Sequence, residues 1–99
     1  MGSAFSPTRR HKDFLDALAT SRRMKVGTVV YQLVLRRMGR PLVDRERAEL
    51  VLRDCRILTR FDDDMTKDLE RQMSLAGIES FAHAMFCVIE EAIERGETL

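Results

Sequence analysis

The chain has 99 residues, of which 44% are hydrophobic and 33% are charged. This length suits one small domain and excludes a doubly wound sheet or a β/α barrel. The composition is typical of a globular chain rather than a disordered one. No apolar run approaches about 18 residues, so we expect no membrane span.

The charges are divided unequally along the chain. Residues 1–40 contain nine Lys and Arg against two Asp and Glu, for +7, whereas residues 61–99 contain three against ten, for −7. Residues 41–60 contribute the remaining +1. This asymmetry favours an anionic partner for the basic half, most often nucleic acid. The competing interpretation is that the two halves neutralise each other, within one molecule or between molecules.

Two helices are predicted in the basic half. Ser6 is an N-cap residue followed by a proline, so we expect the first helix over residues 7–24. Thr28 can cap a second helix over residues 28–38, and Gly39 suits the position just after its end.

Asp44 can cap a short helix over residues 45–54, within the segment 43–54 that connects the two halves. The next residues, 56–61, change to the two-residue period of a strand. One face of this strand is expected to be exposed and to carry Arg56, Leu58 and Arg60. The other face is expected to be buried and to carry Ile57, Thr59 and Phe61.

The acidic half is predicted to continue with two helices. Three aspartates after the strand suit a helix N-terminus, because they accept hydrogen bonds from its free N–H groups. This helix is expected over residues 63–76, and Gly77 ends it. Glu79 or Ser80 then caps a last, mostly apolar helix that runs to about Glu94.

In this order, the strand, the helix, the Ala-Gly-Ile-Glu-Ser turn and the apolar helix of residues 55–96 resemble a ribbon-helix-helix module of the MetJ/Arc class. The resemblance implies a mostly α-helical fold whose short strand pairs antiparallel with a second copy, forming a ribbon that enters the DNA major groove. The base-reading side chains are then Arg56, Leu58 and Arg60. The N-terminus of the second helix, near Glu79 and Ser80, is implied to hold a backbone phosphate.

The second copy can come from another chain or from the same chain. Residues 1–42 repeat the outline of the module in residues 55–99, at an offset of 52 that places Val26 on Ile78. The first half is then a degenerate copy with a poor strand around residues 2–6. The chain would be an internal pseudo-dimer, as in some plasmid-transfer accessory proteins. Otherwise we expect a homo-oligomer.

Basic side chains of the first half are candidates for phosphate contacts. They lie near the ends of the two predicted helices, where some of them also suit the helix dipole. The set comprises Arg9, Arg10, Arg22, Arg23, Lys25, Arg36 and Arg37.

Neither catalytic nor metal-binding residues are predicted. Glu79, His83 and Cys87 share one helix face, but no second ligand cluster completes a site, so His83 is interpreted as a core or interface histidine. Cys55 and Cys87 form no C-x-x-C motif, which favours a reducing cytoplasm and no disulfide. We therefore expect no enzyme activity, no metal and no cofactor.

These features together predict a sequence-specific DNA-binding protein whose partner is double-stranded DNA. It would act as a transcriptional repressor or autoregulator, or as a plasmid-transfer accessory protein. Its expected location is the prokaryotic cytoplasm, at the nucleoid or at a plasmid. The alternative is a protein-binding adaptor, or an antitoxin-like partner, that uses the ribbon only for dimerisation.

Overall fold

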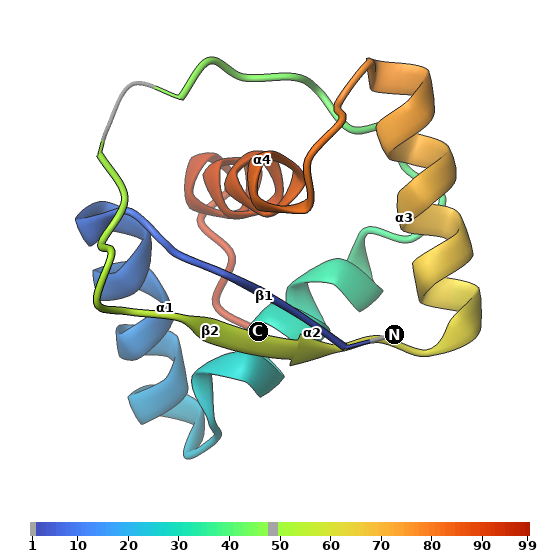
Figure 1. Ribbon diagram of the computed structural model, residues 1–99. Coiled ribbons are helices and arrows are strands. Elements are labelled where there is room, and N and C mark those ends of the chain that lie inside the picture. Colours follow the sequence, from blue (N-terminus) through green and yellow to red (C-terminus); the bar gives the residue numbers. More distant parts are fainter. Residues whose placement is uncertain (1, 48–49) are drawn as a thin grey trace.

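The computed structural model describes residues 2–47 and 50–99, which form two successive strand-helix-helix units (Figure 1). The first unit consists of β1 (Gly2–Phe5), α1 (Arg9–Arg22) and α2 (Val26–Arg36). The second unit consists of β2 (Ile57–Arg60), α3 (Asp63–Ala76) and α4 (Phe81–Glu94). The described chain is therefore mostly α-helical, with two short strands.

β1 and β2 form an antiparallel two-stranded sheet, termed the ribbon below. Its register pairs Phe5 with Ile57 at one end and Gly2 with Arg60 at the other. β1 contains no β-branched residue, so its sequence favours a strand only weakly. It is extended because the N–H and C=O groups of β2 need a partner, and β1 supplies one from the same chain.

The alternation predicted for residues 56–61 is confirmed. The buried members are Ile57, Thr59 and Phe61, and the exposed members are Arg56, Leu58 and Arg60. Thr59 is accommodated on the inward face because its hydroxyl donates to the carbonyl of Ser3 at 3.1 Å. A buried hydroxyl without such an acceptor would be destabilising.

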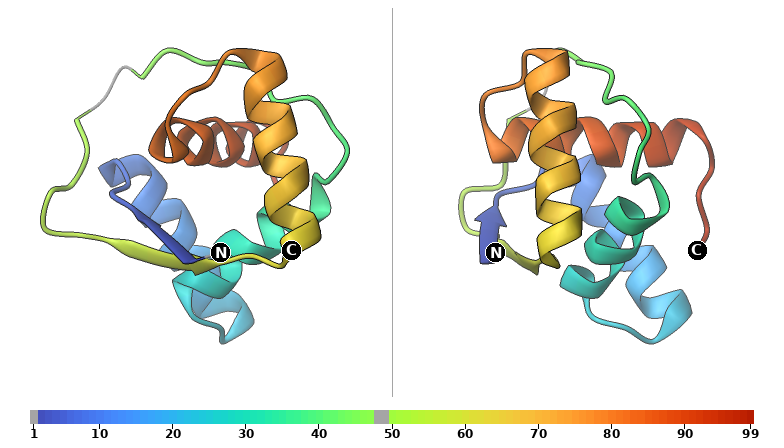
Figure 2. Two further views of the ribbon diagram at one scale, coloured as in Figure 1. Left: turned by 45° about the vertical axis from the view of Figure 1, so that its right-hand side comes forward. Right: turned by 90° about the vertical axis from the view of Figure 1, so that its right-hand side faces the viewer.

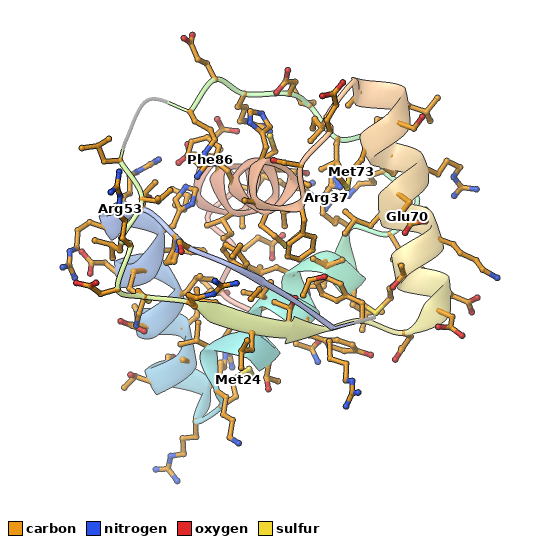
Figure 3. All side chains as sticks on the ribbon, in the orientation of Figure 1. Met24, Arg37, Arg53, Glu70, Met73 and Phe86 are labelled. Carbon is orange, nitrogen blue, oxygen red and sulfur yellow. The ribbon has the colours of Figure 1, made fainter. Side chains whose placement is uncertain are left out.

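α4 carries the centre of the core. Figures 1 and 2 show α4 between the ribbon and the segment that connects the two units. Seven of its 14 residues are buried, and they pack with the fully buried Leu15 of α1, Val30 of α2 and Met65 of α3. Figure 3 shows side chains filling the space between α4 and the ribbon. The two units thus share one core, as expected for a chain too short to bury two.

The first helix begins two residues later than predicted, because its N-cap is Thr8 and not Ser6. The Thr8 hydroxyl accepts a hydrogen bond from the His11 backbone N–H at 3.1 Å. The Pro7 carbonyl accepts one from the Leu52 N–H at 2.7 Å. Pro7 therefore belongs to a chain crossing that precedes the helix.

The second helix begins before its predicted cap, Thr28. Its N-cap is Lys25, which makes no side-chain cap hydrogen bond. Gly27 consequently lies in the first helical turn, against the backbone of β2. A Cβ on Gly27 would lie 2.5 Å from the carbonyl oxygen of Leu58, so glycine is what permits α2 to approach the ribbon.

The short helix expected over residues 45–54 is not present in the described part of that segment. Val51 instead forms an isolated antiparallel bridge with Thr8, and Leu50 is 92% exposed. The segment has to cross from the end of α2, past α4, to the start of β2 (Figure 2). The Val51 bridge and the hydrogen bond from the Leu52 N–H to the Pro7 carbonyl use backbone groups that a helix would need, which explains the non-helical form of this part of the segment.

α3 and α4 agree with the prediction. α3 covers the expected residues and ends at Gly77, whose φ of 73° is left-handed. Ser80, one of the two predicted caps of α4, accepts a hydrogen bond from the His83 N–H at 3.0 Å. Within the described residues, no single helix has the length and apolarity to cross a membrane. α3 and α4 reach that length only as a pair bent by 91°.

Candidate nucleic-acid interface

The exposed face of the ribbon carries its long side chains on one strand. Leu58 is 75% exposed, and the exposed side chains of Arg56 and Arg60 flank it along the chain. Ala4 of β1 lies opposite Leu58 in the register. A surface hollow of about 520 Å³ lies over both strands here. This surface, termed the ribbon face, therefore combines two guanidinium groups with one apolar side chain, all from the second unit.

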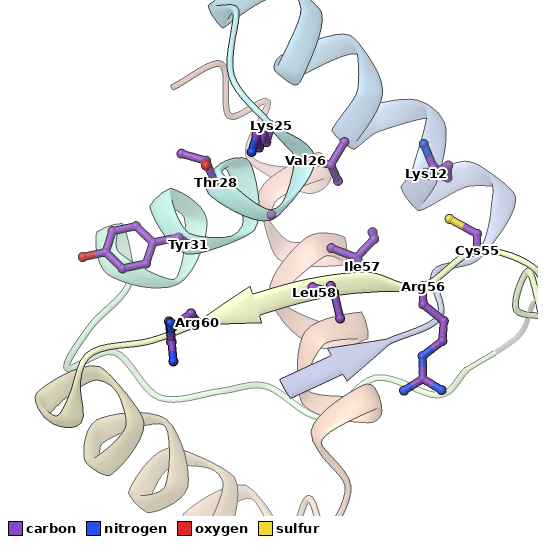
Figure 4. Close-up of a pocket in the computed structure, with 11 residues that line it drawn as sticks. Lys12, Lys25, Val26, Thr28, Tyr31, Cys55, Arg56, Ile57, Leu58 and Arg60 are labelled. Atoms are coloured by element: carbon purple, nitrogen blue, oxygen red, sulfur yellow. The ribbon is translucent and has the colours of Figure 1, made fainter. Parts of the chain in front are cut away.

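A second hollow, of about 630 Å³, lies beside β2 on the side of the first unit (Figure 4). Arg56 and Arg60 stand at opposite ends of β2, while Lys12 comes from α1 and Lys25 from the start of α2. The described residues that line this hollow include no Asp or Glu. Lys12 is paired with Asp16 at 2.5 Å, so the positive charge offered to an anion on this concave surface comes from Lys25, Arg56 and Arg60.

The N-terminus of α2 opens into the same hollow. Residues 25–28 line it, and no side chain caps the first turn of the helix. The partial positive charge of a helix N-terminus therefore adds to the charge of Lys25. Tyr31 lies further along α2 and donates its hydroxyl to Asp62 at 3.0 Å. This hydrogen bond raises the pKa of Tyr31.

The N-terminus of α4, where a phosphate contact was predicted, has the opposite character. The Ser80 hydroxyl already accepts from His83, and the hollow at this end is lined by Glu79 and Asp44. Neither Glu79 nor Ser80 lines the two hollows at the ribbon. Two carboxylates disfavour an anion at the N-terminus of α4, whereas no described carboxylate lines the hollow at the N-terminus of α2.

Ion pairs with the acidic end of the chain neutralise much of the basic charge in the first half. The pairs are Arg10–Glu90, Arg36–Glu97, Arg37–Glu91 and Arg40–Glu91. Burial raises the pKa of Glu90, but hydrogen bonds from Arg10 and His11 outweigh it and lower that pKa overall. Charge pairing within the molecule accounts for these side chains.

Arg37 is a buried residue, which corrects its assignment as a phosphate contact. Its side chain is 6% exposed and lies 2.8 Å from the Glu91 carboxylate. It also donates to the carbonyl of Pro41 at 3.1 Å. Burial lowers the pKa of Arg37, and Glu91 acts in the opposite direction. The guanidinium group is therefore committed to holding the end of α2 against α4.

The remaining basic candidates are Arg9, Arg22, Arg23 and Lys25, all exposed. Of these, Lys25 lines the hollow beside β2, and Arg22 donates to the carbonyl of Thr98 at 3.1 Å. Lys12 also lines that hollow but was not predicted. Its signal in the sequence is its place in the basic run Arg-Arg-His-Lys at residues 9–12.

Comparison of the chain with protein-family models, with curated proteins and with solved structures found no match. The functional interpretation therefore depends on the arrangement of residues alone. Three features of that arrangement coincide: an exposed ribbon face, a cationic hollow beside it, and a helix N-terminus that opens into the hollow.

Proposed function

We propose that the chain is a sequence-specific DNA-binding protein of the ribbon-helix-helix type, and that it contains both copies of the module. The observation that carries this proposal is the exposed ribbon face, with arginines on both sides of Leu58. Two strand-helix-helix units that share one antiparallel ribbon support it, because a single unit would need a second copy to complete the ribbon. On this proposal the chain is an internal pseudo-dimer, and no second chain is required.

Base reading follows from the chemistry of the ribbon face. A two-stranded ribbon fits the major groove, where each base pair presents its own pattern of donors and acceptors. Arg56 and Arg60 can each donate two parallel hydrogen bonds to the O6 and N7 of a guanine. Leu58 is apolar and exposed, so it suits the methyl group of a thymine. The ribbon face would thus prefer guanines on either side of a thymine.

Phosphates are held, on this proposal, at the N-terminus of α2. The helix dipole and Lys25 act on the same hollow, and a phosphate there is adjacent to the ribbon face. Glu79 and Asp44 make the N-terminus of α4 unsuited to the same role. Additional phosphate contacts are proposed for the exposed residues Arg9, Arg22 and Arg23.

The DNA site is expected to be asymmetric. β2 supplies the long side chains of the ribbon face, whereas β1 places Ala4 opposite Leu58. A dimer of identical chains would present the same residues twice and would favour a palindrome.

In the prokaryotic cytoplasm, at the nucleoid or a plasmid, such a protein acts by occupying DNA. The roles that fit are a repressor or autoregulator and a plasmid-transfer accessory protein.

The surface of α3 favours a second candidate, a protein-binding adaptor. Asp63, Asp64 and Glu70 are exposed on this helix, and Leu75 is 76% exposed. A basic partner protein would pair with these carboxylates and cover the leucine. The ribbon would then serve only to hold the two units together.

Binding to a random DNA duplex, followed by fluorescence anisotropy at increasing salt, tests the proposal. We expect the logarithm of the affinity to fall linearly with the logarithm of salt, with a slope of about −0.9 for each phosphate neutralised. Lys25→Ala should reduce the steepness by about one phosphate. Arg71→Ala removes a cation of α3 that pairs with Asp68, and it should change nothing. No binding at low salt, or equal loss in both variants, would favour the adaptor.

A further inference from the structure

Three potential metal ligands converge where the connecting segment passes α4. Asp44 belongs to that segment, and His83 and Cys87 lie one turn apart on α4. One ligand atom from each residue lies within 4.8 Å of the other two. The Asp44 carboxylate and the His83 Nε2 are 2.6 Å apart and share a hydrogen bond. The helical spacing predicted that His83 and Cys87 share one face, but no pattern in the sequence indicated that Asp44 lies close to them.

We infer that Asp44, His83 and Cys87 form a binding site for Zn²⁺ or a divalent cation of similar softness. One carboxylate oxygen, one imidazole nitrogen and one thiolate are the ligand types that Zn²⁺ takes in proteins. Three protein ligands leave a fourth tetrahedral position. A shallow hollow of about 320 Å³, lined by Asp44, His83 and Glu79, lies at the outer side of the site. Water can occupy the fourth position from there.

The three ligands differ in burial, from Cys87 in the core to Asp44 at the surface. Cys87 is fully buried, the His83 side chain is 27% exposed and the Asp44 side chain is 58% exposed. A cation therefore enters from the Asp44 side and meets the thiol at the inner end. Burial raises the pKa of Cys87, and the backbone N–H of Arg45 opposes this by donating to its sulfur. A bound cation deprotonates a coordinating thiol, and that N–H then stabilises the thiolate.

The ligand atoms have to move to accept the cation, because their separations run from 2.6 Å up to at most 4.8 Å, so that the longer ones shorten by up to about 1.5 Å and the shortest one lengthens. Ligand atoms around a tetrahedral Zn²⁺ lie about 3.3–3.8 Å apart, given metal–ligand bonds of about 2.0–2.3 Å. The oxygen of Asp44 therefore has to move outward from the His83 nitrogen by somewhat less than about 1 Å. Asp44 lies in an exposed, non-helical segment, so it can make this movement without disturbing α4.

A cation at this position would join the connecting segment to α4. The segment is already held there by the Arg45–Glu94 ion pair at 2.7 Å and by Arg47, whose guanidinium lies 5.7 Å from the centre of the Phe86 ring. Figure 1 shows that this crossing lies on the side of α4 away from the ribbon. The inference therefore does not depend on the proposed DNA binding.

Titration of the full chain with Co²⁺ tests the site, because Co²⁺ adopts the tetrahedral geometry of Zn²⁺ and gives an absorption band when bound by a thiolate. We expect one equivalent to bind with a thiolate band, Zn²⁺ to displace it, and Zn²⁺ to raise the melting temperature. Cys87→Ser should abolish the band, whereas Cys55→Ser, which removes the other cysteine, should retain it.

Asp44→Asn provides a variant whose folding is not at risk, because Asp44 is exposed. We expect it to weaken Co²⁺ binding at least about tenfold while circular dichroism stays unchanged. The inference is overturned if the parent chain shows no thiolate band. It is equally overturned if the band survives Cys87→Ser, disappears in Cys55→Ser, or keeps its affinity in Asp44→Asn.

Discussion

At the residue scale, Gly27 and Glu90 show how single groups join the two units. Gly27 lies where α2 meets β2, and its missing side chain leaves room for the carbonyl of Leu58. Glu90 of α4 accepts hydrogen bonds from Arg10 and His11 of α1. These contacts link residues far apart in the sequence, so no local sequence pattern predicts them. Each contact can be tested by its effect on stability, whatever the function of the protein.

Gly27→Ala should destabilise the protein by about 1–3 kcal/mol, because the added methyl group meets the backbone of β2. The sign is informative, since Gly→Ala in an exposed helix normally stabilises by about 1 kcal/mol. Urea unfolding provides the measurement. Ser74→Ala at an exposed site of α3 is the control and should be neutral or slightly stabilising. A Gly27→Ala variant as stable as the parent would contradict the close approach of α2.

The Glu90 carboxylate should make stability depend on acid pH. Its pKa is lowered in the folded state, so the carboxylate stabilises the fold above the unfolded value of about 4.3. This contribution is lost as the pH falls below that value and through the folded pKa. Urea midpoints measured from about pH 6 to about pH 3 should therefore fall less steeply in Glu90→Gln than in the parent.

Glu70→Gln controls for the removal of one carboxylate, because Glu70 is exposed on α3. Its pH profile should follow that of the parent more closely than Glu90→Gln does. If the Glu90→Gln profile were as steep as the parent's, the hydrogen bonds from Arg10 and His11 to the Glu90 carboxylate would not contribute to stability.

At the element scale, the sequence is most informative where a local signal and the tertiary contacts agree. Gly77 ends α3 where a left-handed residue is needed, and the alternation of residues 56–61 matches the two faces of the ribbon. β1 carries no such signal, because its extended form depends on β2. The helix expected over residues 45–54 had local helix-forming residues, but Val51 and Leu52 instead pair with Thr8 and Pro7 of the first unit. Local preference fails where distant parts of the chain set the conformation.

The same reasoning applies to the cap of α1, and it is testable. Thr8→Ala should destabilise the protein by about 1–2 kcal/mol, because it removes the side-chain acceptor for the His11 N–H. Ser6→Ala should change stability by less than about 0.5 kcal/mol, since Ser6 does not cap the helix. Urea unfolding of both variants is the measurement. A larger loss in Ser6→Ala would restore the cap expected from the sequence alone.

At the scale of the whole molecule, the two units form one body with an unequal surface. The radius of gyration is 12.4 Å, close to the value of about 13 Å expected for one domain of this length. Glutamates of α4 and the residue Glu97 neutralise arginines of the first half, so the +7 of residues 1–40 is much reduced at the surface. Arg56, Arg60 and Lys25 lie outside these pairs. The alternation of residues 56–61 was therefore enough to predict the exposed side chains of the ribbon face. The hollow beside the ribbon could not be predicted, because it is formed by parts of the chain that are distant in sequence.

Enrichment of duplexes from a randomised DNA pool tests the proposed role of the ribbon face most directly. The parent chain should enrich a short, non-palindromic sequence that contains guanines. Arg56→Ala and Arg60→Ala should each relax the preference at a different position, at a loss of about 1–3 kcal/mol for the preferred base. Arg71→Ala should return the parent's sequence. An unselected pool, or a preference that both ribbon variants leave unchanged, would contradict DNA reading by the ribbon face.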